Sequence, residues 1–207
     1  MRAIFISISL LVFGFILAPI TSFAQDTIFL LNGEKYAVKI KKVTNDSLIF
    51  ETLGPGKIKE RRIDKSDVFS LISPNGNEVI MYRQDTGIGN NFAADQMRNY
   101  IYGEQDARKN FHAPLMTVAG AISGVGGFAF LGFYGLMVPP LTTALLSIKS
   151  PKVKAKCVSR RELIDNEYYR SGYQGVAIRK KVKNGLIGGL VSFAVTAVAM
   201  TIYNNNK

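Results

Sequence analysis

Apolar and polar stretches alternate along the 207-residue chain. Long apolar runs occupy residues 1–25, 111–148 and 185–203, with polar segments between them. The first polar segment contains short runs of β-branched and aromatic residues, separated by turn sequences such as Asn32-Gly33 and Asn75-Gly76. This pattern is typical of strands joined by tight turns.

The segment from residue 26 to residue 83 is predicted to be a small β domain. Strands are expected at 27–31, 36–43, 47–51, 58–63, 68–72 and 78–82, with one helical turn at 64–67. Six short strands favour a strongly bent sheet, and closure into a barrel would remove its exposed edges. We therefore expect a barrel-like domain at 25–84, similar to Sm-like or Src-homology-type small barrels, within an α+β membrane protein.

Basic residues alternate along two of these strands. Lys57, Lys59 and Arg61 share one side of the first, and Lys39 and Lys41 share one side of the second. Side by side they would form a basic strip able to bind an anionic polymer or lipid head group. The alternative is the ordinary solvated face of a two-sided sheet.

Residues 85–112 are interpreted as a linker and a juxtamembrane helix. Asp85 to Asn91 is polar and contains two glycines, which indicates a flexible linker. Residues 93–111 are expected to be helical, with Glu104 and Arg108 at the i,i+4 spacing of an intrahelical ion pair.

The first apolar run is predicted to be a signal peptide at residues 1–24. Arg2 supplies a positive charge, residues 4–20 are apolar, and Ser22-Phe23-Ala24 places small residues at the positions that favour cleavage after Ala24. An uncleaved anchor is the alternative. Either way, the chain that follows is expected to be exported. No cysteine lies near this site, which excludes a lipoprotein signal.

Two transmembrane helices are predicted, at 113–138 and 185–203. The first has 26 uncharged residues, about 39 Å as a helix against a hydrocarbon core of about 30 Å. Pro139-Pro140 should break this helix or force a new one, leaving an interfacial half-helix at 139–148. Residues 204–207 form a short tail.

Small residues recur in both predicted spans at the spacing that lets helix backbones approach closely. The glycines concerned are Gly120, Gly124, Gly185 and Gly189. They predict a two-helix transmembrane hairpin, or self-association through these helices.

The basic character of the chain belongs to one segment. The net charge of the chain is +11, and residues 149–183 hold 11 Lys and Arg against three Asp and Glu, a net of +8. The β domain is close to neutral, which argues against nucleic-acid binding. The positive-inside bias therefore predicts that residues 149–184 form a cytoplasmic loop.

Within this basic loop, Ser159 to Glu162 has the spacing of a capping box that starts a helix, and Gly172 is its expected stop. Candidate contacts to anionic lipid lie just before the second span, at Arg179, Lys180, Lys181 and Lys183.

The sequence contains no recognisable catalytic arrangement. It lacks a Gly-x-Ser-x-Gly elbow and a phosphate-binding loop. His112 and Cys157 are the only residues of their types, so we expect no metal, no cofactor and no enzyme activity. The leading hypothesis is a non-enzymatic interaction or scaffold protein, whose partners are the lipid bilayer and a protein. The alternative, a subunit of an oligomeric channel or transporter, lacks the ionisable residues expected within the spans.

The order of parts resembles uncharacterised bacterial envelope proteins. The resemblance rests on the two Asn-Gly turns, on Tyr100-Ile101-x-Gly103-Glu104-x-Asp106-Ala107, and on a Tyr169-x-x-Gly172-Tyr173 element before Gly188-Gly189. Tyr100-x-x-Gly103 and Tyr169-x-x-Gly172 are also similar to each other, as in a degenerate repeat. The resemblance supports the architecture only and implies no activity. From the export signal and the apolar segments we expect an inner-membrane protein with a periplasmic N-terminal domain.

Overall fold

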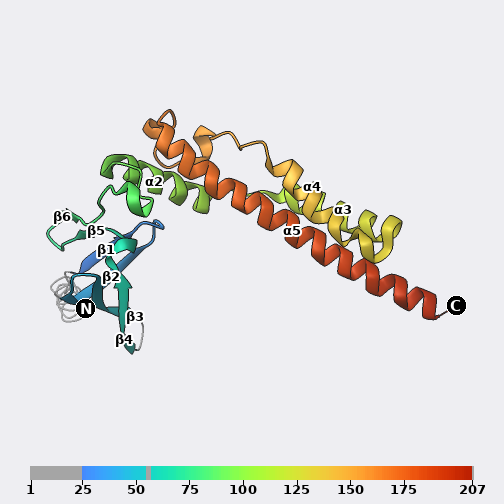
Figure 1. The fold of residues 1–207 in the computed structure, drawn as a ribbon, viewed down its shortest axis with the longest axis horizontal. Helices are drawn as coiled ribbons and strands as arrows, with labels where there is room; N and C mark the ends of the chain where they lie inside the picture. The colour runs from blue at the N-terminus through green and yellow to red at the C-terminus, as the bar shows by residue number, and fades with distance from the viewer. Residues whose placement is uncertain (1–24, 55–56, 207) are drawn as a thin grey trace, which may run out of the picture.

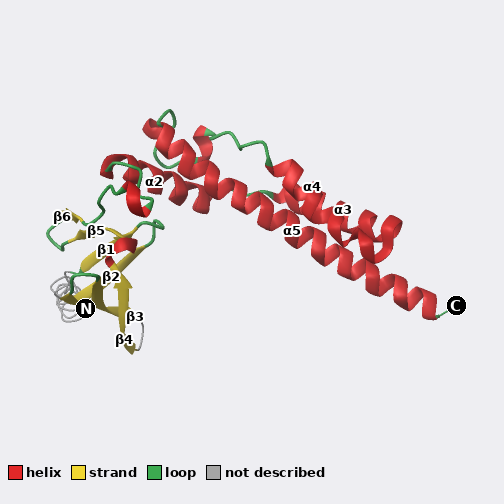
Figure 2. Cartoon of the chain, in the orientation of Figure 1, coloured by secondary structure: helices red, strands yellow, loops and turns green. Residues whose placement is uncertain are grey.

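The computed structural model describes residues 25–54 and 57–206, and the predicted signal peptide lies outside them. The chain has an α+β architecture, with an antiparallel sheet at one end and long apolar helices at the other (Figures 1 and 2). Helix α2 (Ala94–Asn110) lies between these two parts.

The six predicted strands are present in one antiparallel sheet of order β4-β3-β2-β1-β5-β6. A single turn of 3-10 helix at Lys65–Asp67 joins β4 to β5, as predicted. Within the described residues β4 pairs only with β3 and β6 only with β5, so the sheet is not closed and the expected barrel is not confirmed. The strands are β1 (Asp26–Leu30), β2 (Lys35–Val43), β3 (Ser47–Gly54), β4 (Lys57–Asp64), β5 (Val68–Ile72) and β6 (Glu78–Ile80).

Apolar side chains cover both faces of the sheet, because neighbouring residues of a strand point to opposite sides. Ile28 belongs to a core cluster on one face. On the other face the rings of Phe29 and Phe69 meet edge to face, with centroids 5.5 Å apart. Ile101 of α2 is fully buried against this second cluster. The sheet and α2 therefore form one packed unit, which the predicted domain boundary at residue 84 divides.

The predicted linker is a turn with defined hydrogen bonds. Asp85 and Asn90 pair as an isolated β-bridge, and a 3-10 turn at Thr86–Ile88 ends at Gly89, which has a φ of 86°. The Tyr82 hydroxyl donates to the carbonyl of Phe92 at 2.9 Å. These contacts fix the direction in which the chain enters α2.

The predicted basic strip does not form, because β3 lies between the two strands that carry it. Lys39 lies opposite Glu51, whereas Arg61 lies opposite Phe50. Residues directly opposite each other share a face, so Lys39 and Arg61 belong to opposite faces. The Lys41 ammonium pairs with the Glu51 carboxylate at 3.1 Å.

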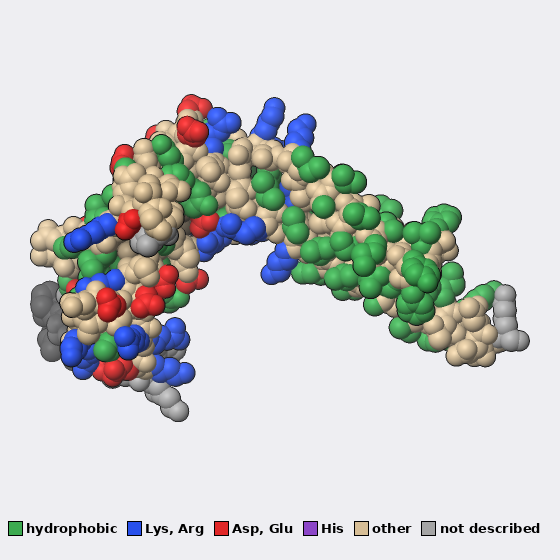
Figure 3. All heavy atoms as spheres, in the orientation of Figure 1, with side chains coloured by type: hydrophobic (Ala, Val, Ile, Leu, Met, Phe, Trp, Pro, Cys, Tyr) green, Lys and Arg blue, Asp and Glu red, His purple; other side chains and the backbone are tan. Residues whose placement is uncertain are grey.

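Two helical segments, Pro114–Ser147 and Glu167–Asn205, are long and apolar enough to cross a membrane. Their surface is covered by apolar side chains, and basic side chains gather where this surface ends (Figure 3). This agrees with the predicted membrane location.

The first of these segments is folded back on itself, which corrects the prediction of a single helix at 113–138. Helix α3 (Pro114–Leu131) ends at Gly132, whose φ of 57° lies in the left-handed region that favours glycine. A 3-10 segment, η3 (Gly132–Met137), turns the chain into α4 (Val138–Ser147). Pro139-Pro140 lies in the first turn of α4, where proline is tolerated, so a new helix starts there, which is one of the two predicted outcomes.

The second segment is one 39-residue helix, α5 (Glu167–Asn205). The side chain of Asn166 caps it by accepting a hydrogen bond from the Tyr169 N–H at 3.1 Å. The capping box predicted at residues 159–162 is followed only by a 3-10 turn, η5 (Arg161–Leu163). Gly172, the predicted helix stop, lies inside α5.

Helices α2 and α3 run parallel to α5. Gly103 of α2 faces Tyr169, and further along Gly120 of α3 faces Gly185. Helix α4 runs the opposite way, because its Thr143 faces Gly185 while the earlier Pro139 faces a later residue of α5. The half-helix at 139–148 is thus packed against α5, not lying flat at an interface.

The two predicted spans are not arranged as the predicted two-helix hairpin, because α3 and α5 run parallel. Since α3 and α4 form a hairpin of their own, the chain after α4 returns to the end of α3 from which it left. The Lys181 ammonium bonds the carbonyl of Lys149 at 3.1 Å, and that of Lys180 bonds the carbonyl of Phe111 at 2.9 Å. The basic segment therefore lies at the same end of the apolar helices as α2 and the sheet.

Candidate functional site

Backbone-to-backbone contacts join α5 to its neighbours at glycines. A Cβ atom on Gly120 would collide with the carbonyl of Gly185, and one on Gly124 with the carbonyl of Gly189. The four predicted packing glycines thus meet in one interface within the chain. Such close approach favours helix association where the lipid is as apolar as the interface.

The same type of contact continues between α2 and α5. A Cβ on Gly103 would collide with the carbonyl of Tyr169, and one on Gly172 with the carbonyl of Tyr100. The two similar Tyr-x-x-Gly elements therefore pack against each other reciprocally. This explains why α5 continues through Gly172: the glycine admits the neighbouring backbone and does not end the helix.

A buried acidic group lies beside this crossing. The Asp106 side chain is on a residue only 3% exposed, and its Oδ2 accepts hydrogen bonds from the Tyr169 hydroxyl at 2.5 Å and the Ser159 N–H at 2.9 Å. Burial alone would raise the pKa of Asp106, but these hydrogen bonds favour the charged form and hold its pKa below the ordinary value. Asp106 thereby ties the basic segment and α5 to α2.

Glu104, on the same helix, is 6% exposed and pairs with two guanidinium groups. The Arg108 group lies 2.8 Å from its carboxylate, at the predicted i,i+4 spacing, and the Arg179 group lies at 2.7 Å. A buried carboxylate requires such partners to remain charged. Arg179 is therefore a structural partner of Glu104 in this arrangement.

Two of the other predicted lipid-contact residues cap helix ends. The Lys180 ammonium bonds the carbonyls of Ala107, Arg108 and Phe111 at the C-terminus of α2. The Lys181 ammonium bonds the carbonyls of Leu146 and Lys149 at the end of α4. Cations satisfy the unpaired carbonyls of a helix C-terminus and its negative dipole. Of the four, only Lys183 keeps an exposed side chain without a described capping role.

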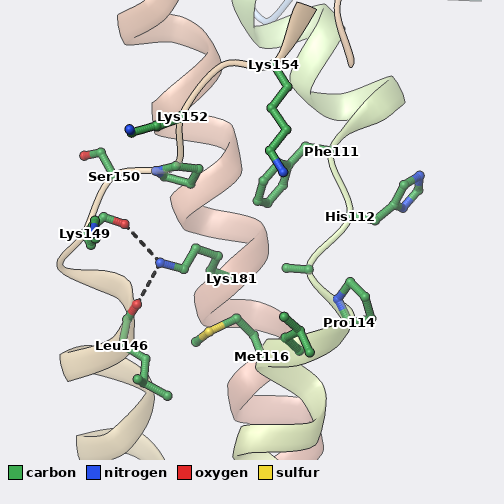
Figure 4. A pocket seen from close by; sticks show the side chains of 13 residues that line it. Phe111, His112, Pro114, Met116, Leu146, Lys149, Ser150, Lys152, Lys154 and Lys181 are labelled. Atoms are coloured by element: carbon green, nitrogen blue, oxygen red, sulfur yellow. Dashed lines mark hydrogen bonds between the residues drawn. The ribbon is translucent and has the colours of Figure 1, made fainter. Parts of the chain in front are cut away.

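A groove of about 610 Å³ opens beside Lys181 (Figure 4). One wall is the connection from α2 to α3, residues 111–116, and the other is the end of α4 with the basic segment after it. Lys149, Lys152 and Lys154 lie at its rim, and the Lys154 side chain extends toward the Phe111 ring. Sequence reasoning missed this site, since it placed residues 112 and 149 on opposite sides of a membrane.

The described residues contain no cluster of three or more His, Cys, Asp or Glu that could hold a metal ion. His112 lines the groove, and Cys157 is partly buried at the end of the 3-10 turn η4 (Ala155–Cys157). The acidic residues Glu104 and Asp106 are each engaged by the partners described above. The geometry thus offers packing, charge pairing and a lysine-rimmed groove.

No protein-family model, curated protein or solved structure matches the chain.

Proposed function

We propose that the chain is a non-enzymatic, membrane-embedded scaffold that holds a β module at a fixed position beside the bilayer. The observation that carries this proposal is the double packing of α2. Ile101 is buried against the sheet, while Gly103 and Ala107 pack toward α5. A helix held on both sides transmits the position of the membrane helices to the sheet, as a flexible tether would not.

The β module is the part that faces a protein partner in this proposal. Strand β4 has a free edge among the described strands, and β6 exposes Val79 and Ile80 at 57% and 47%. Free edges and exposed apolar strand residues are the features by which sheets accept another chain.

We place the module on the periplasmic face of a bacterial inner membrane. The predicted export signal acts before any later segment is inserted, and the first segment usually dominates orientation. The basic segment then shares that face, against the positive-inside bias. Part of the positive charge of this segment stabilises the fold, since Lys180 and Lys181 cap the ends of α2 and α4.

A spin-label distance measurement tests the rigid coupling. Labels at K59C in β4 and S171C in α5, in a C157S background, should give one narrow distance distribution. Gly172→Leu should broaden it, because a side chain there meets the α2 backbone. The control Gly126→Leu should leave it unchanged, since a Cβ at Gly126 meets nothing within 4 Å. A broad distribution in the unsubstituted chain would refute the rigid scaffold.

A photo-crosslinking amino acid tests the interaction role in cells. Placed at Lys59 or at Val79, it should give a discrete protein adduct. The control position Asn206, at the far end of α5, should not give the same adduct. If neither sheet position gives an adduct, the sheet is not the interaction surface.

A channel or transporter subunit is the second candidate, favoured by one observation. The hydroxyls of Thr143 and Ser147 in α4 are buried, with no hydrogen-bond partner among the described residues. Unpaired hydroxyls at membrane depth are costly unless water or an ion reaches them. Conductance of the purified chain in planar bilayers tests this candidate. If no conductance is measured, the scaffold is the remaining candidate.

A further inference from the structure

The lysine-rimmed groove continues into the apolar part of the molecule. A second groove, of about 500 Å³, runs between α3 and α4, and Leu146 lines both. The residues that line the second groove extend along α3 from Ala119 to Phe130 and Leu131, which lie near the tip of the hairpin. The two grooves therefore adjoin at Leu146, the first beside the basic segment and the second along the hairpin.

The charge of the two parts differs sharply. The mouth is bordered by Lys149, Lys152, Lys154 and Lys181, and none of the described residues that line it is acidic. The ammonium of Lys181 is already bonded to two carbonyls, which leaves three exposed lysines to meet a ligand. The deeper groove is lined by apolar residues, two small hydroxyl residues and two glycines.

The position of the mouth matches the edge of a bilayer. Leu115, which lines the mouth, is 81% exposed and belongs to the apolar surface of α3. Basic side chains gather where that surface ends (Figure 3), and Lys149 directly follows the exposed Ile148. A molecule that fills both parts must be negatively charged at one end and apolar over a length comparable to a helical hairpin.

We propose that the groove binds an anionic phospholipid, with its head group among Lys149, Lys152 and Lys154 and one acyl chain between α3 and α4. A free phosphate would leave the apolar groove unfilled, and a neutral lipid would leave the lysines without a counter-charge. Gly126 provides room for the chain, since a Cβ there meets nothing within 4 Å. This site differs from the sequence-predicted set, in which Arg179, Lys180 and Lys181 have internal partners.

Native mass spectrometry of the purified full chain in nonionic detergent tests the proposal. Dioleoylphosphatidylglycerol should bind with one saturable site and more tightly than dioleoylphosphatidylcholine. Glycerol phosphate, which carries the head group alone, should not compete. Equal affinity for the two lipids, or competition by glycerol phosphate at the same concentration, would overturn the site as described.

Matched variants separate the groove from general electrostatics. K149Q/K152Q/K154Q should weaken phosphatidylglycerol binding about a hundredfold, because each juxtamembrane lysine contributes about 1 kcal/mol. K39Q/K42Q/K59Q removes the same charge from the sheet and should leave binding unchanged. Equal loss in both triple variants would show non-specific attraction and refute the site.

The acyl-chain part has its own pair of variants. Gly126→Phe should fill the deeper groove and reduce phosphatidylglycerol binding, whereas Val125→Phe, on an exposed position outside the groove, should not. If Gly126→Phe leaves phosphatidylglycerol binding unchanged, the acyl chain does not lie in the groove between α3 and α4. Circular dichroism and gel filtration show that each variant is folded, and the spin-label distance above tests the scaffold separately.

Discussion

At the scale of single residues, Asp106 shows how one charged side chain can hold three segments together. Its carboxylate is buried and accepts hydrogen bonds from Ser159 in the basic segment and from Tyr169 in α5. The Tyr169 side chain is itself fully buried. The sequence marks Asp106 only as part of a motif, since its partners lie 53 and 63 residues away.

The charge of Asp106 should make the stability of the chain depend on pH. Its pKa is lower in the folded than in the unfolded chain, so its stabilising effect is present above the unfolded value of about 3.9 and is lost as the pH falls through the folded value. Asp106→Asn should lower the unfolding free energy at pH 7 by about 1.5–3 kcal/mol. It should also flatten the decline in stability between pH 5 and pH 3.

Denaturant unfolding of the full chain in detergent, monitored by circular dichroism, measures both effects. Asp95→Asn is the matched control, because Asp95 lies on the same helix and is exposed. The role of Asp106 is contradicted if both variants have the same stability and the same pH dependence.

At the scale of secondary-structure elements, glycine decides how the helices pair. In an isolated helix each of these glycines lowers the stability of the helix, and a glycine in a helical sequence is ordinarily interpreted in this way. Gly120 and Gly172 instead lie where the backbone of a neighbouring helix fills the space of a side chain. Gly126 lies in the same glycine-rich helix as Gly120, but a Cβ there would meet nothing within 4 Å. The difference is set by the crossing geometry and cannot be read from the spacing alone.

Alanine at these positions should therefore change stability in opposite directions. Gly120→Ala should lower the unfolding free energy by about 1–3 kcal/mol, because the methyl group forces the backbones of α3 and α5 apart. Gly126→Ala should raise it by up to about 1 kcal/mol through its better helix propensity. Unfolding of the full chain by increasing SDS in mixed micelles gives both values. If both variants lose the same unfolding free energy, the contact of Gly120 with the α5 backbone has no specific effect on stability.

At the scale of the whole molecule, the hairpin of α3 and α4 sets the topology. Because it returns the chain to its starting end, the β module, α2 and the basic segment lie at one end of the apolar helices, and only α5 extends the chain to the other end. Length and charge counts favour a different answer: 26 uncharged residues suffice for a span, and a net charge of +8 is typical of a cytoplasmic loop.

Single cysteines in a C157S background distinguish the two topologies. In spheroplasts, a membrane-impermeant thiol reagent should label K59C in the sheet and K156C in the basic segment equally, and should label N206C in the tail only after permeabilisation. The positions are exposed, so protection would report the membrane and not burial. Labelling of K59C without K156C would restore the predicted cytoplasmic loop. Labelling of N206C alone would place the shared face in the cytoplasm.

The sequence by itself determined the local elements of this protein. Strand positions, the α2 helix and the apolar segments follow from side-chain periodicity and turn residues, which act over a few neighbours. The four packing glycines and the two helices that they join were also found by spacing, although the parallel direction of these helices was not. What only the tertiary structure decided was the direction of the chain through the apolar region and the partners of its charges. A single positive-φ glycine, Gly132, reverses the helix there. The lysines then bind backbone carbonyls whose positions depend on how distant segments pack.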